Sequence, residues 1–306
     1  MTVTVAIGPS SFAEENDAPR RLLEAAGITI KDNPYGRRLT EAEVITHLQG
    51  CDGLIAGLEP LNRTVIALAS PRLKAIARVG IGVANVDFEA AAQYNVKVSS
   101  TPEGPIDAVA EMTVSALLAI NRRLFSTSEA LRQGKWKKEI GAGLKGAQVL
   151  LIGYGRIGRR TAELLAAFGA EILVCDPYIN ASSLKNGEKW VSMEEGLREA
   201  DAISLHAAGE SCILGAPEFL RMKHGVTLLN SARGNLVDEK ALLHALDTGI
   251  VGQVWFDALW QEPYTGPLTQ YPQALLTPHI ATYTRQCRLE MESAAACNLL
   301  RDLGIG

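Results

Sequence analysis

The stretch from Val149 to Arg160 reads VLLIGYGRIGRR, an apolar run that leads into glycines spaced as Gly153-x-Gly155-x-x-Gly158. This spacing between a strand and a helix is typical of a loop that holds a dinucleotide pyrophosphate. An acidic residue, Asp176, ends the next apolar run, where its carboxylate would accept hydrogen bonds from ribose hydroxyls. The stretch therefore predicts a βαβ unit with a dinucleotide site, and about half of the chain precedes it.

The residues around Asp176 also bear on which dinucleotide is bound. A carboxylate would repel a 2′-phosphate, and the next residues are Pro177 and Tyr178 rather than Arg or Lys. NAD is therefore favoured over NADP. Arg156 lies inside the glycine loop, where two roles stay open: neutralising the pyrophosphate or pointing to solvent.

Short apolar runs alternate with helical patterns in both halves of the chain, which indicates parallel sheets with helices on both faces. The length of 306 residues suits about two domains. Two long stretches, 107–134 and 285–304, each predict one helix. The expected strands are 2–7, 28–30, 53–57, 73–79 and 96–100, then 149–153, 171–176, 202–207, 226–232, 254–259 and 274–277.

Composition excludes several classes of protein. The net charge of −4 gives no basic excess of the kind that nucleic-acid binders carry. The five cysteines are scattered without a C-x-x-C pair, so we expect buried thiols in a reducing compartment and no metal site. No signal peptide is evident, and the apolar runs fall far short of the roughly 20 residues that span a bilayer. We therefore expect a cytoplasmic protein with neither a membrane nor a nucleic-acid partner.

Three chemically versatile residues follow predicted strands of the second half: Arg233 in NSARG, Glu262 in ALWQEP and His279 in TPHI. Open α/β sheets bind ligands at this rim. Together they suit hydride transfer on a 2-oxo acid, with Arg233 clamping the carboxylate, His279 exchanging the proton on the substrate oxygen and Glu262 orienting the histidine. Taken singly, each has a structural alternative: a surface ion pair, a solvated loop charge or a histidine in a fixed turn.

With these residues the chain resembles the D-isomer-specific 2-hydroxyacid dehydrogenases, in particular their phosphoglycerate-dehydrogenase-like branch. The resemblance runs through nearly the whole length. It is carried by RVGIGVANVD (78–87), STPEGPIDAVAE (100–111), GYGRIG (153–158), CDPY (175–178), NSARGNLVDE (230–239), DALWQEP (257–263) and TPHI (277–280).

The resemblance implies an α/β fold of two Rossmann-like, doubly wound parallel-sheet domains, with the nucleotide-binding domain inserted into a flavodoxin-like substrate domain. Residues 1–101 plus 283–306 would form the substrate-binding domain, and residues 102–282 the NAD-binding domain. Hinges would lie near Thr101–Pro102 and Thr282–Thr284, with the active site in the cleft. Family members form a two-fold dimer through the region 107–134, which implies a homodimer.

The resemblance also implies site residues beyond the catalytic set of Arg233, Glu262 and His279. Those implied for cofactor binding are Gly153, Gly155, Arg156, Ile157, Gly158, Asp176, Pro177, Ala207, Ser231, Ala232, Asp257 and Ala281. Those implied for substrate binding are Ala56, Gly57, Gly80, Ile81, Gly82, Arg233 and His279.

The expected activity is an NAD-dependent oxidoreductase that interconverts a D-(R)-2-hydroxy acid and its 2-oxo acid. One alternative is a D-3-phosphoglycerate dehydrogenase proper without a regulatory domain, although GLEPL (57–61) has no arginine where such enzymes hold the substrate phosphate. An alternative of another class is an NAD(H)-sensing, corepressor-like interaction protein. A formate-dehydrogenase-like activity is disfavoured, because its chemistry needs no acid–base pair such as Glu262 and His279.

Overall fold

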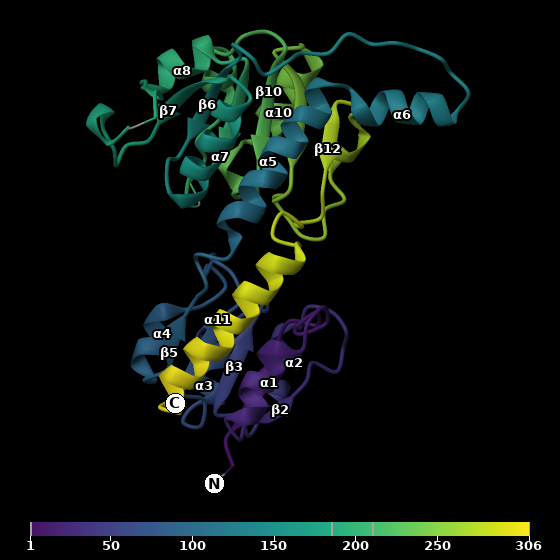
Figure 1. Cartoon of the computed structure of the whole chain (residues 1–306). Coiled ribbons are helices and arrows are strands. Elements are labelled where there is room, and N and C mark those ends of the chain that lie inside the picture. Colours follow the sequence, from purple (N-terminus) through teal and green to yellow (C-terminus); the bar gives the residue numbers. More distant parts are fainter. Residues whose placement is uncertain (1, 185, 210, 306) are drawn as a thin grey trace. The chain divides into compact units, whose positions relative to one another are not determined.

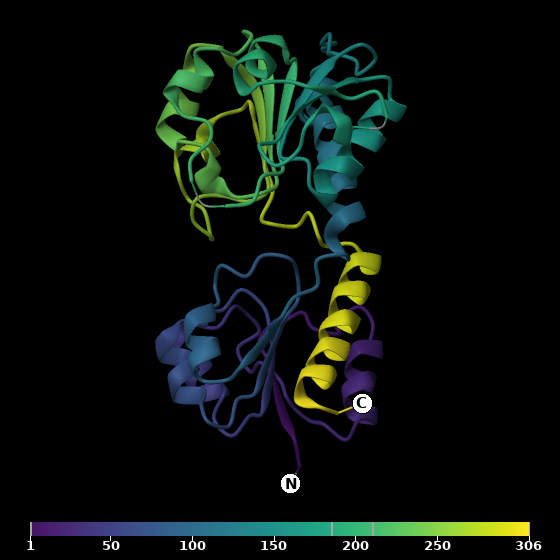
Figure 2. The same ribbon diagram turned by 90° about the vertical axis from the view of Figure 1, so that its left-hand side faces the viewer.

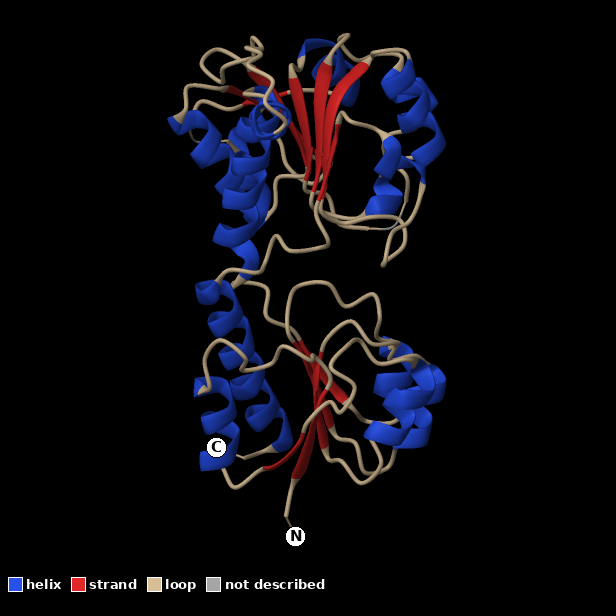
Figure 3. Ribbon diagram, turned by 90° about the vertical axis from the view of Figure 1, so that its right-hand side faces the viewer, coloured by secondary structure: helices blue, strands red, loops and turns tan. Residues whose placement is uncertain are grey.

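The computed structural model describes residues 2–184, 186–209 and 211–305. It divides the chain into two compact units (Figure 1). Unit 1 comprises Met1–Pro105 together with Tyr283–Gly306, and unit 2 comprises Ile106–Thr282. Unit 2 is therefore an insertion in the sequence of unit 1. In each unit a parallel sheet has helices on both faces (Figure 3), which confirms the expected fold class.

The sheet of unit 1 has five parallel strands in the order β2-β1-β3-β4-β5. This is the flavodoxin-like order, in which the second strand lies at one edge and the chain then crosses to the other side of β1. The strands are β1 (Thr4–Ile7), β2 (Thr29–Lys31), β3 (Gly53–Ala56), β4 (Ala75–Arg78) and β5 (Lys97–Ser99).

The helices of unit 1 cover both faces of this sheet. One face packs against α2 (Glu41–His47), α3 (Arg63–Ala69) and α4 (Phe88–Gln93) through a core that includes Val44, Val65, Ile66 and Ala90. The other face is covered by α1 (Ala18–Ala25) and α11 (Arg285–Leu303), which lie side by side (Figure 2).

Helix α11 joins unit 1 from the far end of the chain. Thr284 caps its start, since its hydroxyl accepts a hydrogen bond from the Cys287 amide at 3.1 Å, and Gly304, in the left-handed region, caps its end. Its apolar side is buried, and Leu299 reaches Gly53 on β3. Because this side is buried, α11 is part of the unit 1 core. Each fully buried aliphatic side chain contributes about 2 kcal/mol to the free energy of unfolding.

The sheet of unit 2 has seven parallel strands in the order β12-β11-β10-β9-β6-β7-β8, the doubly wound order of a dinucleotide-binding fold with one added strand. The strands are β6 (Gln148–Ile152), β7 (Glu171–Cys175), β8 (Lys189–Trp190), β9 (Ala202–Leu205), β10 (Val226–Asn230), β11 (Val251–Phe256) and β12 (Ala274–Leu276).

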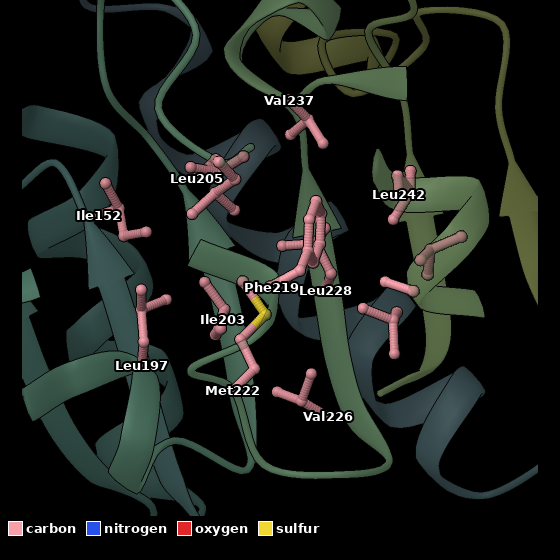
Figure 4. Close-up of a cluster of buried hydrophobic side chains, with 14 of the residues drawn as sticks. Ile152, Leu197, Ile203, Leu205, Phe219, Met222, Val226, Leu228, Val237 and Leu242 are labelled. Carbon is pink, nitrogen blue, oxygen red and sulfur yellow. The ribbon is translucent and has the colours of Figure 1, made fainter. Parts of the chain in front are cut away.

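Two buried clusters fill the two faces of the unit 2 sheet. One contains side chains of α5 (Pro105–Asn121) and α7 (Arg156–Ala167). The other contains side chains of α8 (Met193–Glu199), α9 (Ala216–Phe219) and α10 (Glu239–Asp247); Figure 4 shows Leu197, Phe219 and Leu242 in this cluster. The sheet is thus buried on both sides, which explains why its strands read as continuous apolar runs.

The structure corrects the single helix predicted over 107–134. Two helices occupy this stretch, α5 and α6 (Leu124–Arg132), because Arg123 has a φ of 55° and stops the first helix. The strand expected at 254–259 lies earlier, at 251–256, and the two-residue edge strand β8 was not predicted. Among the described residues no helix has both the length and the apolarity needed to cross a bilayer.

Candidate active site

The glycine loop of unit 2 joins β6 to α7. Gly153 has a φ of 96°, and a Cβ there would lie 2.6 Å from the backbone nitrogen of Ala207. A Cβ on Gly158 would lie 2.4 Å from the Gly153 carbonyl oxygen, so both positions need glycine for the close packing of loop, helix and strand. In contrast, a Cβ on Gly155 would meet nothing within 4 Å. The loop is therefore tight on its protein side and open at Gly155, where a pyrophosphate would approach the start of α7.

Asp176 directly follows β7, beside the glycine loop. Its two oxygens accept hydrogen bonds from the amides of Tyr154, at 2.7 Å, and Tyr178, at 2.8 Å. The Tyr154 hydroxyl in turn donates to Glu188 Oε1 at 2.7 Å, and burial together with this carboxylate raises the pKa of Tyr154. Asp176 is thus fixed at the end of β7 and keeps lone pairs that ribose hydroxyls could use.

His206 follows β9 and lies against the glycine loop. Its amide donates to the Ile152 carbonyl at 2.8 Å, and its Nε2 lies 2.9 Å from the Ser204 hydroxyl. Burial lowers the pKa of His206 to about 4, so the ring is neutral near pH 7. Ala207, which follows it, provides the backbone against which Gly153 packs.

The structure brings His279 and Glu262 together. Nδ1 of His279 lies 2.8 Å from Oε1 of Glu262, and each side chain is about one-third exposed, at 34% and 32%. The backbone of His279 is left-handed, with a φ of 55°, and its amide hydrogen bonds to the carbonyls of Asp257 and Thr277 hold it there. Backbone strain of this kind is commonly found at functional positions.

Asp257 organises the segment that carries His279. It is 1% exposed, and its carboxylate accepts hydrogen bonds from the Thr277 hydroxyl at 2.6 Å and from the amides of Ile280 and Ala281, both at 2.8 Å. The indole of Trp255 donates to the same Thr277 hydroxyl at 3.0 Å. Asp257 thereby fixes the turn in which His279 lies.

The loop that carries Glu262 is anchored by aromatic residues. Trp260 stacks on Phe256 with ring centroids 5.1 Å apart, and its indole donates to the Val237 carbonyl at 2.7 Å. A Cβ on Gly234 would lie 2.3 Å from the carbonyl carbon of Leu259. The loop after β11 therefore packs directly on the loop after β10.

Arg233 lies on that loop after β10. The buried Asn230 shapes it, since its Oδ1 accepts from the Ala232 amide at 3.0 Å and its Nδ2 donates to the Arg233 carbonyl at 2.8 Å. The half-buried Arg233 side chain donates to the Ala232 carbonyl at 2.7 Å. Ser231 precedes this pair and is also half-buried.

Sequence reasoning missed Asn230 and Thr277 as organising residues. For Asn230 the signal was present, because Asn commonly bonds the amide two residues further on. For Thr277 no local signal exists, because its partners Trp255 and Asp257 lie on another strand and the loop that follows it.

The substrate residues expected in unit 1 lie at the carboxyl ends of its strands. Ala56 ends β3 and Gly57 follows it, while Gly80 to Gly82 follow β4. The Gly80 amide donates to the Thr101 hydroxyl at 2.7 Å. A ligand carboxylate at this loop would therefore use the amides of Ile81 and Gly82 instead.

The donor set of unit 2 fits NAD. The open glycine loop, the exposed Arg156 beside it, the half-buried Ile157 and the fixed Asp176 with the exposed Pro177 offer what a pyrophosphate and a ribose require. Among the described residues no group of three or more His, Cys, Asp or Glu side chains could hold a metal ion.

Fold and site thus define a dinucleotide-binding α/β protein. The chain belongs to the D-isomer-specific 2-hydroxyacid dehydrogenases: the family model described as "D-isomer specific 2-hydroxyacid dehydrogenase, NAD binding domain" matches residues 114–281. Its cofactor is accordingly NAD.

Two kinds of comparison agree with this. D-3-phosphoglycerate dehydrogenase 3 of Arabidopsis thaliana is 34% identical over 260 residues, which cover 82% of this chain and 44% of that protein. This chain therefore spans less than half the length of that relative. The solved structure of the TT0316 protein from Thermus thermophilus superposes with a TM-score of 0.89 at 32% identity, covering 99% of this chain and 97% of the other. A glyoxylate reductase from Paecilomyes thermophila superposes with a TM-score of 0.87 at 29% identity, covering 99% and 95%.

Proposed function

We propose that this protein is an NAD-dependent oxidoreductase that interconverts a D-(R)-2-hydroxy acid and the corresponding 2-oxo acid. The observation that carries the proposal is the 2.8 Å contact between His279 Nδ1 and Glu262 Oε1 in an NAD-binding unit. A histidine paired with a carboxylate in this way is the arrangement expected of a general acid–base.

In this proposal the histidine moves the proton of the reacting hydroxyl. A carboxylate can only accept a hydrogen bond, so Nδ1 of His279 carries a proton. The other ring nitrogen, Nε2, is therefore the one that exchanges a proton with the substrate oxygen. In the oxidation direction Nε2 removes the hydroxyl proton, and the substrate carbon loses its hydride as the carbonyl forms. NAD held at the glycine loop and Asp176 would supply the hydride acceptor, and NADH would supply the hydride donor in the reverse direction. The Glu262 carboxylate stabilises the imidazolium that results.

Arg233 binds the substrate carboxylate through its planar guanidinium. Its loop is shaped by Asn230 and packs on the loop of Glu262, which supports a shared task for the two side chains. In unit 1, the backbone amides of Ile81 and Gly82 are donors that a ligand carboxylate could use.

The test is NADH oxidation by purified protein with a panel of 2-oxo acids. The panel includes glyoxylate, pyruvate, hydroxypyruvate, 3-phosphohydroxypyruvate, and branched and aromatic analogues. We expect turnover with at least one of them and a loss of about 100-fold or more in kcat for His279→Ala. Tight NADH binding without any turnover would overturn the proposal and favour an NAD(H)-sensing interaction protein. A strong preference for 3-phosphohydroxypyruvate would identify a D-3-phosphoglycerate dehydrogenase instead.

We also propose that the protein is a homodimer through the region 107–134 and the segment after it. Large apolar side chains are exposed on and beyond α6, among them Phe125, Leu131, Trp136 at 82% and Ile140 at 100%. Burying these side chains against a second copy would be favourable. We expect the mass in solution to be that of a dimer, and Phe125→Lys with Leu131→Lys to give a monomer. A wild-type protein that stays monomeric at all concentrations would contradict this.

A further inference from the structure

Glu59 is a buried carboxyl side chain at the carboxyl edge of the unit 1 sheet. It is 1% exposed, and its two oxygens accept hydrogen bonds from the Gly57 amide, at 2.9 Å and 3.1 Å. Asn85 holds the same loop, since its Nδ2 donates to the Glu59 carbonyl at 2.7 Å. An acidic side chain is rarely this buried unless it is paired with other groups of the protein.

The position of Glu59 coincides with the point where parallel sheets of this topology bind ligands. In the order β2-β1-β3-β4-β5 the winding reverses between β1 and β3, and ligands bind outside the carboxyl ends of the strands at such a switch point. Gly8 follows β1 and Gly57 follows β3. A Cβ on Gly8 would lie 2.0 Å from Oε1 of Glu59, and one on Gly57 would lie 2.9 Å from Oε2. The Glu59 carboxyl group therefore fills the crevice between these two strand ends.

The surroundings of this carboxyl group are those of an anion site. Burial raises the pKa of Glu59, while the Gly57 amide and the positive charges of Arg78 and Arg38 act in the opposite direction. Arg78 ends β4, the neighbour of β3. Backbone amides and guanidinium groups of this kind bind phosphates and carboxylates of ligands. Here the acceptor that the Gly57 amide bonds is a carboxylate of the protein itself.

We propose that Glu59 determines substrate specificity: its side chain fills the switch-point crevice of unit 1 and keeps the phosphate or second carboxylate of a ligand out of it. This inference rests on the proposed dehydrogenase function for its substrate class. It assigns to the enzyme 2-oxo acids whose side chain carries no second anionic group. Exclusion of the wrong ligand by a like charge or by lost space is a recognised source of specificity.

The first test measures whether phosphate binds in the crevice, and it does not depend on enzymatic turnover. Thermal unfolding is followed with increasing inorganic phosphate, in the presence of NADH so that the dinucleotide site is filled. We expect phosphate to raise the Tm of Glu59→Ala by at least about 2 °C over the small non-specific effect seen with wild type. Glu89→Gln, a charge change at an exposed position on α4 of the same unit, should behave as wild type. Glu59→Gln keeps the volume and removes the charge, so it shows whether charge or space excludes phosphate.

The second test measures specificity. The ratio of kcat/KM for 3-phosphohydroxypyruvate to that for hydroxypyruvate should rise about tenfold or more in Glu59→Ala or Glu59→Gln, and stay unchanged in Glu89→Gln. The proposal is overturned if neither Glu59 variant changes this ratio or gains stabilisation by phosphate. If no 2-oxo acid is turned over by wild type, the proposed function fails, while the phosphate titration still decides whether Glu59 closes an anion site.

Discussion

His279 and Glu262 are joined by a 2.8 Å contact between Nδ1 and Oε1, although 17 positions separate them in the sequence. The two loops that carry them follow β12 and β11, which are neighbours in the sheet. Parallel pairing places the carboxyl ends of adjacent strands at one edge, so the pair is assembled by the sheet and not by local sequence.

Replacing Glu262 by glutamine should lower kcat by roughly 100-fold, because an amide no longer stabilises a charged imidazole or fixes its tautomer. The Kd of NADH should stay within about twofold, since Glu262 is not among the residues proposed to bind the cofactor. Steady-state kinetics and fluorescence titration measure both quantities. Glu194→Gln on α8 is the matched control; an unchanged kcat in Glu262→Gln would remove the carboxylate from the mechanism.

The left-handed backbone at His279 leads to a prediction on stability. A glycine adopts a φ of 55° without strain, whereas alanine does not. The free energy of unfolding should therefore be about 1 kcal/mol larger for His279→Gly than for His279→Ala. In denaturant unfolding, His279→Gly should have the higher midpoint concentration. Both variants should be inactive. Equal stabilities would show that the turn relaxes when the histidine is lost.

The glycine loop offers a matched pair of substitutions. Gly158→Ala places a methyl group 2.4 Å from the Gly153 carbonyl oxygen, and should lower the Tm by several degrees. Gly155→Ala meets no protein atom within 4 Å, so the Tm without ligand should be unchanged. Its Kd for NADH should rise about tenfold or more, because the methyl group would stand where we propose that the pyrophosphate binds. Unaltered NADH binding by Gly155→Ala would place the dinucleotide away from this loop.

Asp176→Asn should weaken the preference for NAD over NADP by about tenfold or more, since it removes the charge that repels a 2′-phosphate. The amide oxygen can still accept from the Tyr154 amide, which should keep the glycine loop in place, although the hydrogen bond from the Tyr178 amide is lost. The measurement is the ratio of Kd values for NADH and NADPH. Glu171→Gln, at the other end of β7, controls for the change in net charge; an Asp176→Asn ratio equal to that of wild type would refute the role.

His206 predicts a pH dependence of stability. Its pKa is about 4 in the folded protein against 6.5 in the unfolded chain, so the unfolded chain binds the additional proton between these values. The contribution of the neutral His206 to the free energy of unfolding is fully present above pH 6.5. It is lost as the pH drops toward 4, by up to about 3 kcal/mol. Urea unfolding of His206→Gln should show a correspondingly flatter dependence between pH 7 and 5. The exposed His244→Gln should keep the wild-type slope.

Much of the fold could be predicted from sequence because both sheets are parallel and buried. Their strands read as short apolar runs bounded by glycines, and ten of the predicted strands overlap the observed ones closely, with only the run at 254–259 displaced to Val251–Phe256. That displacement arose because the start of β11, Val251–Gly252–Gln253, is not a continuous apolar run. The break at Arg123 had no signal, since a left-handed arginine is set by tertiary packing and not by its own preference.

The proximity of His279 to Glu262 could be expected from strand order. The hydrogen bonds that hold the His279 turn in place could not. Asp257 is bound by Thr277 and by two backbone amides in a buried network that spans two strands and a turn. Glu59 was not singled out either, because burial of a loop carboxylate depends on Gly8, which lies far away in the sequence.

The position of α11 has a consequence for how the chain folds during synthesis. One face of the unit 1 sheet is covered by α1 and α11, and α11 leaves the ribosome only after the whole of unit 2 has been made. The apolar face of strands β3 and β4 therefore stays uncovered during this time. Unit 2 is one uninterrupted stretch of sequence and can already fold as a whole. The nascent chain should need protection of that face, and the core of unit 1 is completed only by a helix that follows unit 2 in the sequence.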